Sequence, residues 1–153
     1  MKNIAVLAGL TLALSACGDK SGTPAADTTA AVSPPPAAAA GATHNVQMVM
    51  EGTTPKFVPN ELSVKAGDQV VFTYVGTGGP HNVAFYADSV PAGAVPVLMA
   101  QIKDGLDSLS TALLTDPNTS VTISFAGAPA GEYKFTCTPH SAMGMHGKIT
   151  VTP

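Results

Sequence analysis

The sequence contains no arginine, so all seven of its basic residues are lysine. Ten acidic residues give the 153-residue chain a formal net charge of −3 at pH 7. Proteins that bind nucleic acids usually gather Lys and Arg on one face to neutralise phosphates. The charge balance therefore argues against a nucleic-acid partner.

The N-terminus has the pattern of a secretory signal peptide. Lys2 supplies a positive charge, an apolar run covers residues 4–14, and the small residues Ser15 and Ala16 precede Cys17. We predict a signal peptide over residues 1–16 and an exported protein, periplasmic or at the cell surface. The apolar run is too short to span a bilayer as a helix.

The four residues 14–17, LSAC, resemble the lipobox of bacterial lipoproteins, in which the cysteine is acylated after cleavage. We expect Cys17 to carry lipid and to anchor the protein to a bacterial membrane. The alternative is a secreted protein with an unpaired surface thiol. Residues 18–43 are rich in Ala, Pro, Thr and Gly, which is typical of a disordered tether, about 28 Å long on average. The folded domain is then 44–153.

The chain has only two cysteines, which an exported domain would normally join in a disulfide. If Cys17 carries lipid, Cys137 has no partner. A free thiol in an oxidising compartment is a liability unless something holds it, and a metal ion is a common holder. The cysteine count thus favours a metal site at Cys137.

From residue 44 onward, short β-branched segments alternate with Gly and Pro turns, which predicts an all-β sandwich or barrel. Apolar residues at helical spacing interrupt this pattern, and we predict a helical insertion at about 97–114, weakened at Gly105. The strands are expected at 45–50, 61–65, 69–75, 81–86, 119–125, 131–137 and 147–152.

Three candidate ligands lie close together near the C-terminus, where Cys137, His140 and Met145 have the spacing C-x2-H-x4-M. A thiolate and a thioether are soft ligands, and with imidazole they suit copper better than zinc. A second imidazole is needed, and His81 is favoured over His44 because it follows a Gly-rich loop and begins a strand. Two His, one Cys and a distant Met form the ligand set of blue-copper electron-transfer sites.

Three stretches resemble the plastocyanin and pseudoazurin branch of the cupredoxins: FVPNELSVKAGDQVVF (57–72), GGPHNVAFYADSVPAGA (78–94) and YKFTCTPHSAMGMHGKITV (133–151). The resemblance implies a Greek-key β-sandwich with one type 1 copper bound by His81, Cys137, His140 and Met145. It also implies that Asn82 ties the two ligand loops together near the sulfur.

Four protein ligands leave no open coordination position, so we expect an electron carrier rather than an enzyme. The expected partners are redox proteins such as a c-type cytochrome or a membrane electron-transfer complex, and we expect a monomer. The alternative is a copper carrier without a redox role, suggested by further soft side chains at Met48, Met50, Met143 and His146. We expect Met143 on the apolar rim of the site, and His146 and His44 in solvent.

Overall fold

The structure is a computed structural model that describes residues 41–153. The predicted signal peptide, Cys17 and nearly all of the predicted tether lie outside these residues. Strand β1 (Thr43–Glu51) begins one residue before the predicted start of the domain. No helix in the described part of the chain is long and apolar enough to cross a membrane.

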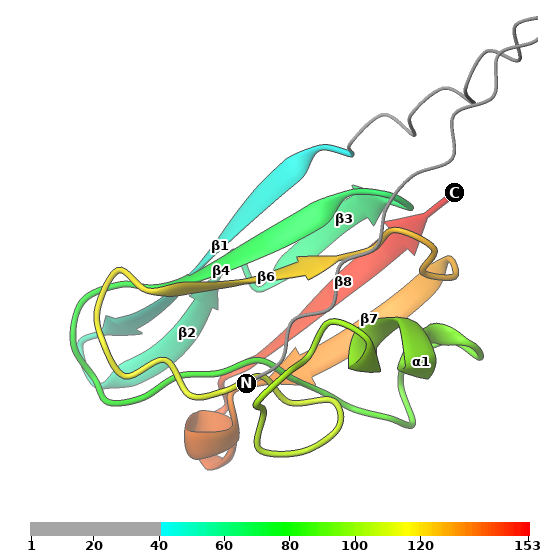
Figure 1. Ribbon diagram of the computed structural model, residues 1–153. Helices are drawn as coiled ribbons and strands as arrows, with labels where there is room; N and C mark the ends of the chain where they lie inside the picture. Colours follow the sequence, from blue (N-terminus) through cyan, green and yellow to red (C-terminus); the bar gives the residue numbers. More distant parts are fainter. Residues whose placement is uncertain (1–40) are drawn as a thin grey trace, which may run out of the picture. The chain divides into compact units, whose positions relative to one another are not determined.

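The predicted all-β sandwich is confirmed. Two four-stranded sheets face each other, with strand orders β2-β1-β4-β6 and β3-β8-β7-β5 (Figure 1). The remaining strands are β2 (Thr54–Val58), β3 (Glu61–Lys65), β4 (Gln69–Tyr74), β5 (Ala84–Phe85), β6 (Ser120–Ser124), β7 (Gly131–Thr136) and β8 (His146–Thr152). Each sheet holds one parallel pair, β1 with β4 and β3 with β8. A parallel pair needs a crossover between its strands rather than a hairpin.

The core lies between the sheets because alternate side chains of each strand point inward. In β4, Val70, Phe72 and Tyr74 are buried, while the residues between them are partly exposed. Phe72 packs edge-on against Phe135 of the other sheet, with ring centroids 5.4 Å apart. Such aromatic pairs add to the stabilisation that comes from burying the rings.

The sequence prediction missed β2, which pairs with β1 at the edge of its sheet. Pro55 lies within this strand and Pro59 follows it, and proline argues against a strand unless the strand is at an edge. The predicted strand over 81–86 is also shorter than expected. Only Ala84 and Phe85 form β5, and His81 makes an isolated bridge to Leu114.

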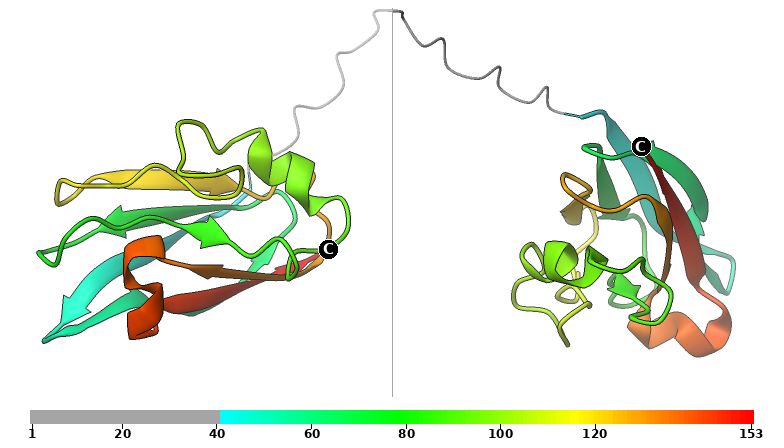
Figure 2. Two further views of the ribbon diagram at one scale, coloured as in Figure 1. Left: turned by 90° about the horizontal axis from the view of Figure 1, so that it is seen from below. Right: turned by 90° about the vertical axis from the view of Figure 1, so that its right-hand side faces the viewer.

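The helical insertion exists, but its predicted extent is wrong. Helix α1 covers Ala94–Met99, and the chain after it is not helical (Figure 2). Residues 107–114 instead run beside the segment that carries His81. Their backbone bonds there include Thr111 N–H to Val83 O at 2.9 Å and Phe85 N–H to Leu109 O at 2.9 Å. These long-range bonds replace the local ones that a helix would have made.

The two ends of the sandwich differ. The base is the end that contains Thr43, Lys65, Asp68 and Thr152. Ala66 N–H donates to Thr152 O there, and Gln69 N–H donates to Ala42 O. The site end is the opposite one. Strands β4 and β7 end there and β8 begins there, and Thr136 of β7 pairs with His146 of β8.

His44 lies at the base and is not simply solvated, contrary to expectation. Its Nε2 is 2.8 Å from Asp68 Oδ2. Asp68 also accepts hydrogen bonds from the backbone N–H groups of Ala42 and Lys65, at 2.8 and 2.9 Å. The carboxylate therefore fixes the start of β1 to the turn after β3.

Candidate metal centre

The site end gathers residues from two distant parts of the chain. His81 precedes β5, Cys137 follows β7, His140 lies in the 3-10 helix η1 (Thr138–Met143), and Met145 precedes β8. The main chain holds this loop closed, because Cys137 N–H donates to Met145 O at 3.0 Å and His140 N–H donates to Cys137 O at 3.1 Å. Gly144 ends η1 with a φ of 82°, a left-handed conformation that favours glycine.

Three candidate ligand atoms converge at this end. The Sγ atom of Cys137 lies 3.6 Å from Nδ1 of His81 and 3.4 Å from Nδ1 of His140. One ligand atom from each residue falls within 4.8 Å of the other two. The sulfur can donate its single proton to one imidazole and accept weakly from a ring N–H of the other, so the tautomers of the two rings decide the direction of these contacts.

The separations fit a shared metal ion. A metal–sulfur bond of about 2.3 Å and a metal–nitrogen bond of about 2.0–2.1 Å, at an angle between tetrahedral and trigonal, place sulfur and nitrogen roughly 3.5–3.8 Å apart. The two distances to Cys137 Sγ are close to this range. The donor set of one thiol and two imidazoles also suits copper.

His81 is kept in the neutral form that binds metals. Its side chain is fully buried, and burial together with the nearby His140 lowers its pKa to about 4. The ring packs on Tyr74, with ring centroids 4.8 Å apart. Among the described residues, none bonds to its buried Nε2. At neutral pH the ring therefore has one nitrogen lone pair available to a metal, and Nδ1 is the atom that faces the Cys137 sulfur.

The thiol of Cys137, in contrast, is not yet in the form that binds metals. It is fully buried and makes no disulfide, and burial raises its pKa. Backbone hydrogen bonds from Asn82 and His140 act in the other direction and favour the thiolate. Without a cation the group is a neutral thiol at pH 7, so metal binding must displace its proton.

Met145 is 1% exposed, and its backbone bonds to both Cys137 and His140. With it, the four residues take an arrangement similar to a type 1 copper site. Met143 is 52% exposed at the surface of the loop. His146 is exposed as well, but its Nδ1 lies 3.1 Å from the hydroxyl of Tyr86, a contact that the sequence did not suggest.

Asn82 is fully buried and bridges the two parts of the site. Its Oδ1 accepts the backbone N–H of Thr138 at 2.7 Å, and its Nδ2 donates to the hydroxyls of Thr138 at 3.1 Å and Ser110 at 2.8 Å. Sequence reasoning missed Ser110 and its neighbour Thr111, whose Oγ1 accepts Val83 N–H. No local motif marks these residues, because they lie 28 positions from their partners.

The fold and the donor set together define a β-sandwich metalloprotein with a soft-ligand site. Residues 44–152 match the family of copper binding proteins, plastocyanin/azurin family. The plastocyanin of Ginkgo biloba is 36% identical over 108 residues, which cover 69% of this chain and 99% of that protein. The chain belongs to the plastocyanin/azurin family of copper-binding proteins.

Solved structures support the same family. Oxidised plastocyanin from the fern Dryopteris crassirhizoma superposes with a TM-score of 0.56 at 33% identity, covering 71% of this chain and 99% of that one. Reduced auracyanin from the photosynthetic bacterium Roseiflexus castenholzii gives a TM-score of 0.51 at 26% identity, covering 74% and 99%. Copper is the cofactor of this family, and membership supports a copper-binding electron carrier rather than an enzyme.

Proposed function

We propose that the protein is an exported, lipid-anchored carrier that passes single electrons between redox proteins, with one copper ion held by His81, Cys137, His140 and Met145. The observation that carries the proposal is the convergence of the Cys137 sulfur with two imidazole nitrogens within 4.8 Å. Bound copper supplies a one-electron couple between its two oxidation states.

The protein's part is to hold these ligands still. Three of them are in one short loop closed by its own backbone hydrogen bonds, and Asn82 ties that loop to the segment carrying His81. A ligand set fixed by the fold changes little between oxidation states, which favours fast electron transfer. Four protein ligands also leave no open position for a substrate.

The exit for electrons is proposed at His140, which is partly exposed at the site end. Met143, in the same 3-10 helix, is 52% exposed, and Leu113, next to the residue that forms a bridge with His81, is 36% exposed. A small apolar patch suits brief, weak docking of a redox partner, such as a c-type cytochrome or a membrane electron-transfer complex. The protein itself is proposed to act as a monomer.

The proposed anchor at Cys17 would join the domain at its base. Ala42 and His44 are fixed there by Asp68, whereas Tyr74, at the other end of β4, contacts His81. The six residues of β4 rise about 3.3 Å each, so the metal centre lies roughly 20 Å from the base. A tether attached at the base leaves the site end free for partners.

A spectrum and a voltammogram of the copper-loaded protein test the proposal. The oxidised protein is expected to absorb strongly in the visible range and to give a reversible one-electron wave. Cys137→Ser should remove the absorption, and its persistence would rule out thiolate ligation. Copper that exchanges readily and gives no reversible wave would favour the copper-carrier alternative. Fatty-acid labelling that is lost in Cys17→Ser tests the anchor separately.

A further inference from the structure

The segment after α1 carries a tight turn over residues 107–110 that ends at the fully buried Ser110. The backbone N–H of Ser110 donates to Asp107 O at 3.3 Å, and the backbone N–H of Leu109 donates to Asp107 Oδ1 at 2.9 Å. The second bond is an Asx turn, in which a side-chain oxygen replaces a backbone acceptor. The side chain of Asp107 therefore shapes the turn, although this residue is exposed.

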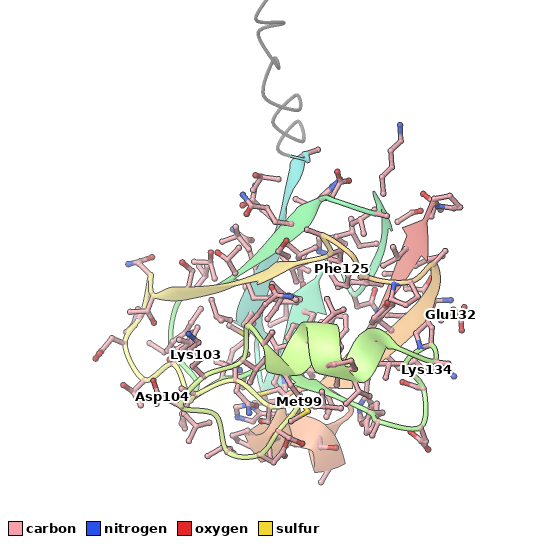
Figure 3. The ribbon with its side chains drawn as sticks, turned by 45° about the vertical axis from the view of Figure 1, so that its right-hand side comes forward. Met99, Lys103, Asp104, Phe125, Glu132 and Lys134 are labelled. Atoms are coloured by element: carbon pink, nitrogen blue, oxygen red, sulfur yellow. The ribbon has the colours of Figure 1, made fainter. Side chains whose placement is uncertain are left out.

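Gly105 lies directly against this turn. Lys103 and Asp104 lead to it in the loop that follows α1 (Figure 3). A Cβ atom added to Gly105 would lie 1.6 Å from Ser110 O and 3.2 Å from Asp107 O. The φ of Gly105 is outside the left-handed region, so the lack of space, and not the backbone conformation, excludes a side chain here. Gly105 therefore lets the chain approach the turn closely.

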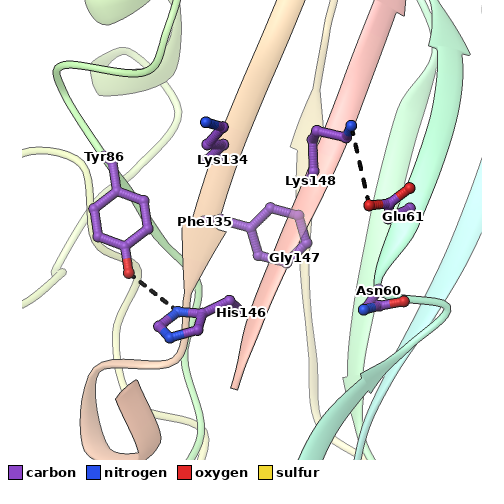
Figure 4. A pocket seen from close by; sticks show the side chains of 8 residues that line it. All are labelled: Asn60, Glu61, Tyr86, Lys134, Phe135, His146, Gly147 and Lys148. Atoms are coloured by element: carbon purple, nitrogen blue, oxygen red, sulfur yellow. Dashed lines mark hydrogen bonds and ion pairs between the residues drawn. The ribbon is translucent and has the colours of Figure 1, made fainter. Parts of the chain in front are cut away.

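The turn rests on β5, which is held from its other side. Ser110 forms an isolated bridge with Ala84 of β5, and both residues of β5 pair with β7. Directly after β5, the hydroxyl of Tyr86 lies 3.1 Å from Nδ1 of His146 in β8 (Figure 4). Because β5 is fixed in this way, a change in the shape of the turn is expected to displace Ser110 rather than β5.

A displacement of Ser110 would reach the ligand loop through Asn82. The side-chain amide of Asn82 donates to the hydroxyls of Ser110 at 2.8 Å and of Thr138 at 3.1 Å, and Thr138 follows Cys137. Ser110 and Asn82 are both fully buried. Buried side chains are closely packed and transmit strain to their neighbours. The position of the Ser110 hydroxyl therefore affects how Asn82 holds the loop.

We propose that Gly105 and Asp107 are positioning residues for the metal centre, because they shape the turn that places Ser110 against Asn82. The proposal rests on the ligand set of the proposed function and adds two residues that orient it from outside. Both residues act through the Asn82 amide rather than on the metal. Contacts of this outer kind hold ligands in place and adjust the affinity and potential of a metal site.

NMR of the metal-free, reduced protein tests these contacts without copper. Gly105→Ala forces a side chain into the turn, and Asp107→Ala removes the acceptor oxygen of the Asx turn. Both variants should shift the side-chain amide signals of Asn82 and the backbone amide signal of Thr138. Asp107→Asn removes the charge but keeps an Oδ1 acceptor, so it should leave these signals where they are in the unaltered protein.

Gly127→Ala is the matched control for Gly105→Ala. Gly127 follows β6, is exposed and has a φ of 74°, and apart from its chain neighbours no described atom lies within 4 Å of an added Cβ. The substitution should strain the backbone and lower stability without moving the Asn82 and Thr138 signals. Equal shifts in both glycine variants would assign the effect to a general loss of stability and overturn the role of Gly105. If Gly105→Ala does not fold, Asp107→Ala tests the turn independently.

Competition with a colorimetric Cu(I) chelator gives a second readout, the copper affinity. Loss of a direct partner of a ligand typically weakens metal binding by roughly 10–100-fold. Asp107 acts further from the metal, so Asp107→Ala should weaken Cu(I) binding by about three- to tenfold and Asp107→Asn should not. Equal weakening in both variants would assign the effect to the lost charge and overturn the role of the Asx turn.

The outcome that overturns the whole proposal is also visible by NMR. Signals of residues 107–111 that move in both alanine variants, while those of Asn82 and Thr138 stay in place, would confine the turn to a purely structural role. The proposed function has a different readout, the reversible wave. A protein without that wave whose Asn82 signals still respond to Asp107→Ala would keep the positioning role and lose the electron-carrier function.

Discussion

The side-chain amide of Asn82 donates to the hydroxyl of Ser110 at 2.8 Å, and both residues are fully buried. This bond connects the segment after α1 to the residue next to His81. Because the same amide group also holds Thr138, beside Cys137, Ser110 helps to set how the two ligand-bearing segments face each other. Outer contacts of this kind orient ligands and tune metal sites.

Ser110→Ala should therefore change the metal centre as well as stability. Loss of one buried hydrogen bond is expected to lower the free energy of unfolding by about 1–2 kcal/mol. The reduction potential should shift on the order of 40 mV, the one-electron equivalent of roughly 1 kcal/mol. Voltammetry and denaturant unfolding measure the two effects. The control is Ser108→Ala, at an exposed position in the same segment. A potential unchanged in Ser110→Ala would leave Ser110 a purely structural role.

Met145→Gln tests the proposed axial ligand. An amide oxygen is a harder donor than a thioether and favours oxidised copper, so the potential should fall while copper is retained. Met143→Gln makes the same chemical change two residues away, at a side chain that is 52% exposed, and should leave the potential unchanged. Voltammetry of both variants gives the comparison. An equal shift of the reduction potential in both variants would mean that Met145 is not the axial ligand.

The ligand loop could be predicted from the sequence, whereas the residues that hold this loop in place could not. Cys137, His140 and Met145 lie within nine positions of one another, so their spacing alone indicates a common site. The contact of Asn82 with Ser110 depends on how residues 107–114 fold back along the His81 segment. The spacing of the apolar residues predicted a helix there, which is wrong. Apolar residues at helical spacing indicate which side chains are buried, but they do not indicate which backbone groups pair.

The contact between Tyr86 and His146 at the surface could not be predicted from the sequence either. They are 60 positions apart, and only the pairing of β5 with β7 and of β7 with β8 brings their side chains together. The sequence predicted that His146 would be exposed, from the alternation of side chains along a strand, and the structure confirms this. Alternation does not identify the neighbour on the next strand, which is set by register.

Asp68→Asn should weaken the base of the domain and change its response to acid. The hydrogen bond with His44 and the backbone N–H of Lys65 hold the pKa of Asp68 below its usual value. A carboxyl whose pKa is lowered by folding stabilises the native state above its unfolded pKa, and this contribution is lost as the pH falls through the folded pKa. The unaltered protein should therefore have the higher thermal midpoint at pH 7, and the difference should shrink at acidic pH.

Thermal unfolding monitored by circular dichroism between pH 7 and pH 2 measures this difference. Asp88→Asn is the control, because Asp88 is exposed and forms no ion pair within the described residues. Its midpoint should follow that of the unaltered protein at every pH. A midpoint difference for Asp68→Asn that stays constant down to pH 2 would show that the charge of Asp68 is not the cause.

Copper binding at pH 7 should release about one proton, because burial raises the pKa of the Cys137 thiol and the bound form is a thiolate. His81 adds nothing to this release, since its pKa of about 4 leaves it neutral at pH 7 before the metal arrives. Titration calorimetry of the metal-free, reduced protein with Cu(I), in buffers of different ionisation enthalpy, counts the protons. Cys137→Ser removes the only buried thiol of the described residues, so any copper that it still binds should release none. Equal release from both proteins would place the displaced proton elsewhere than on Cys137.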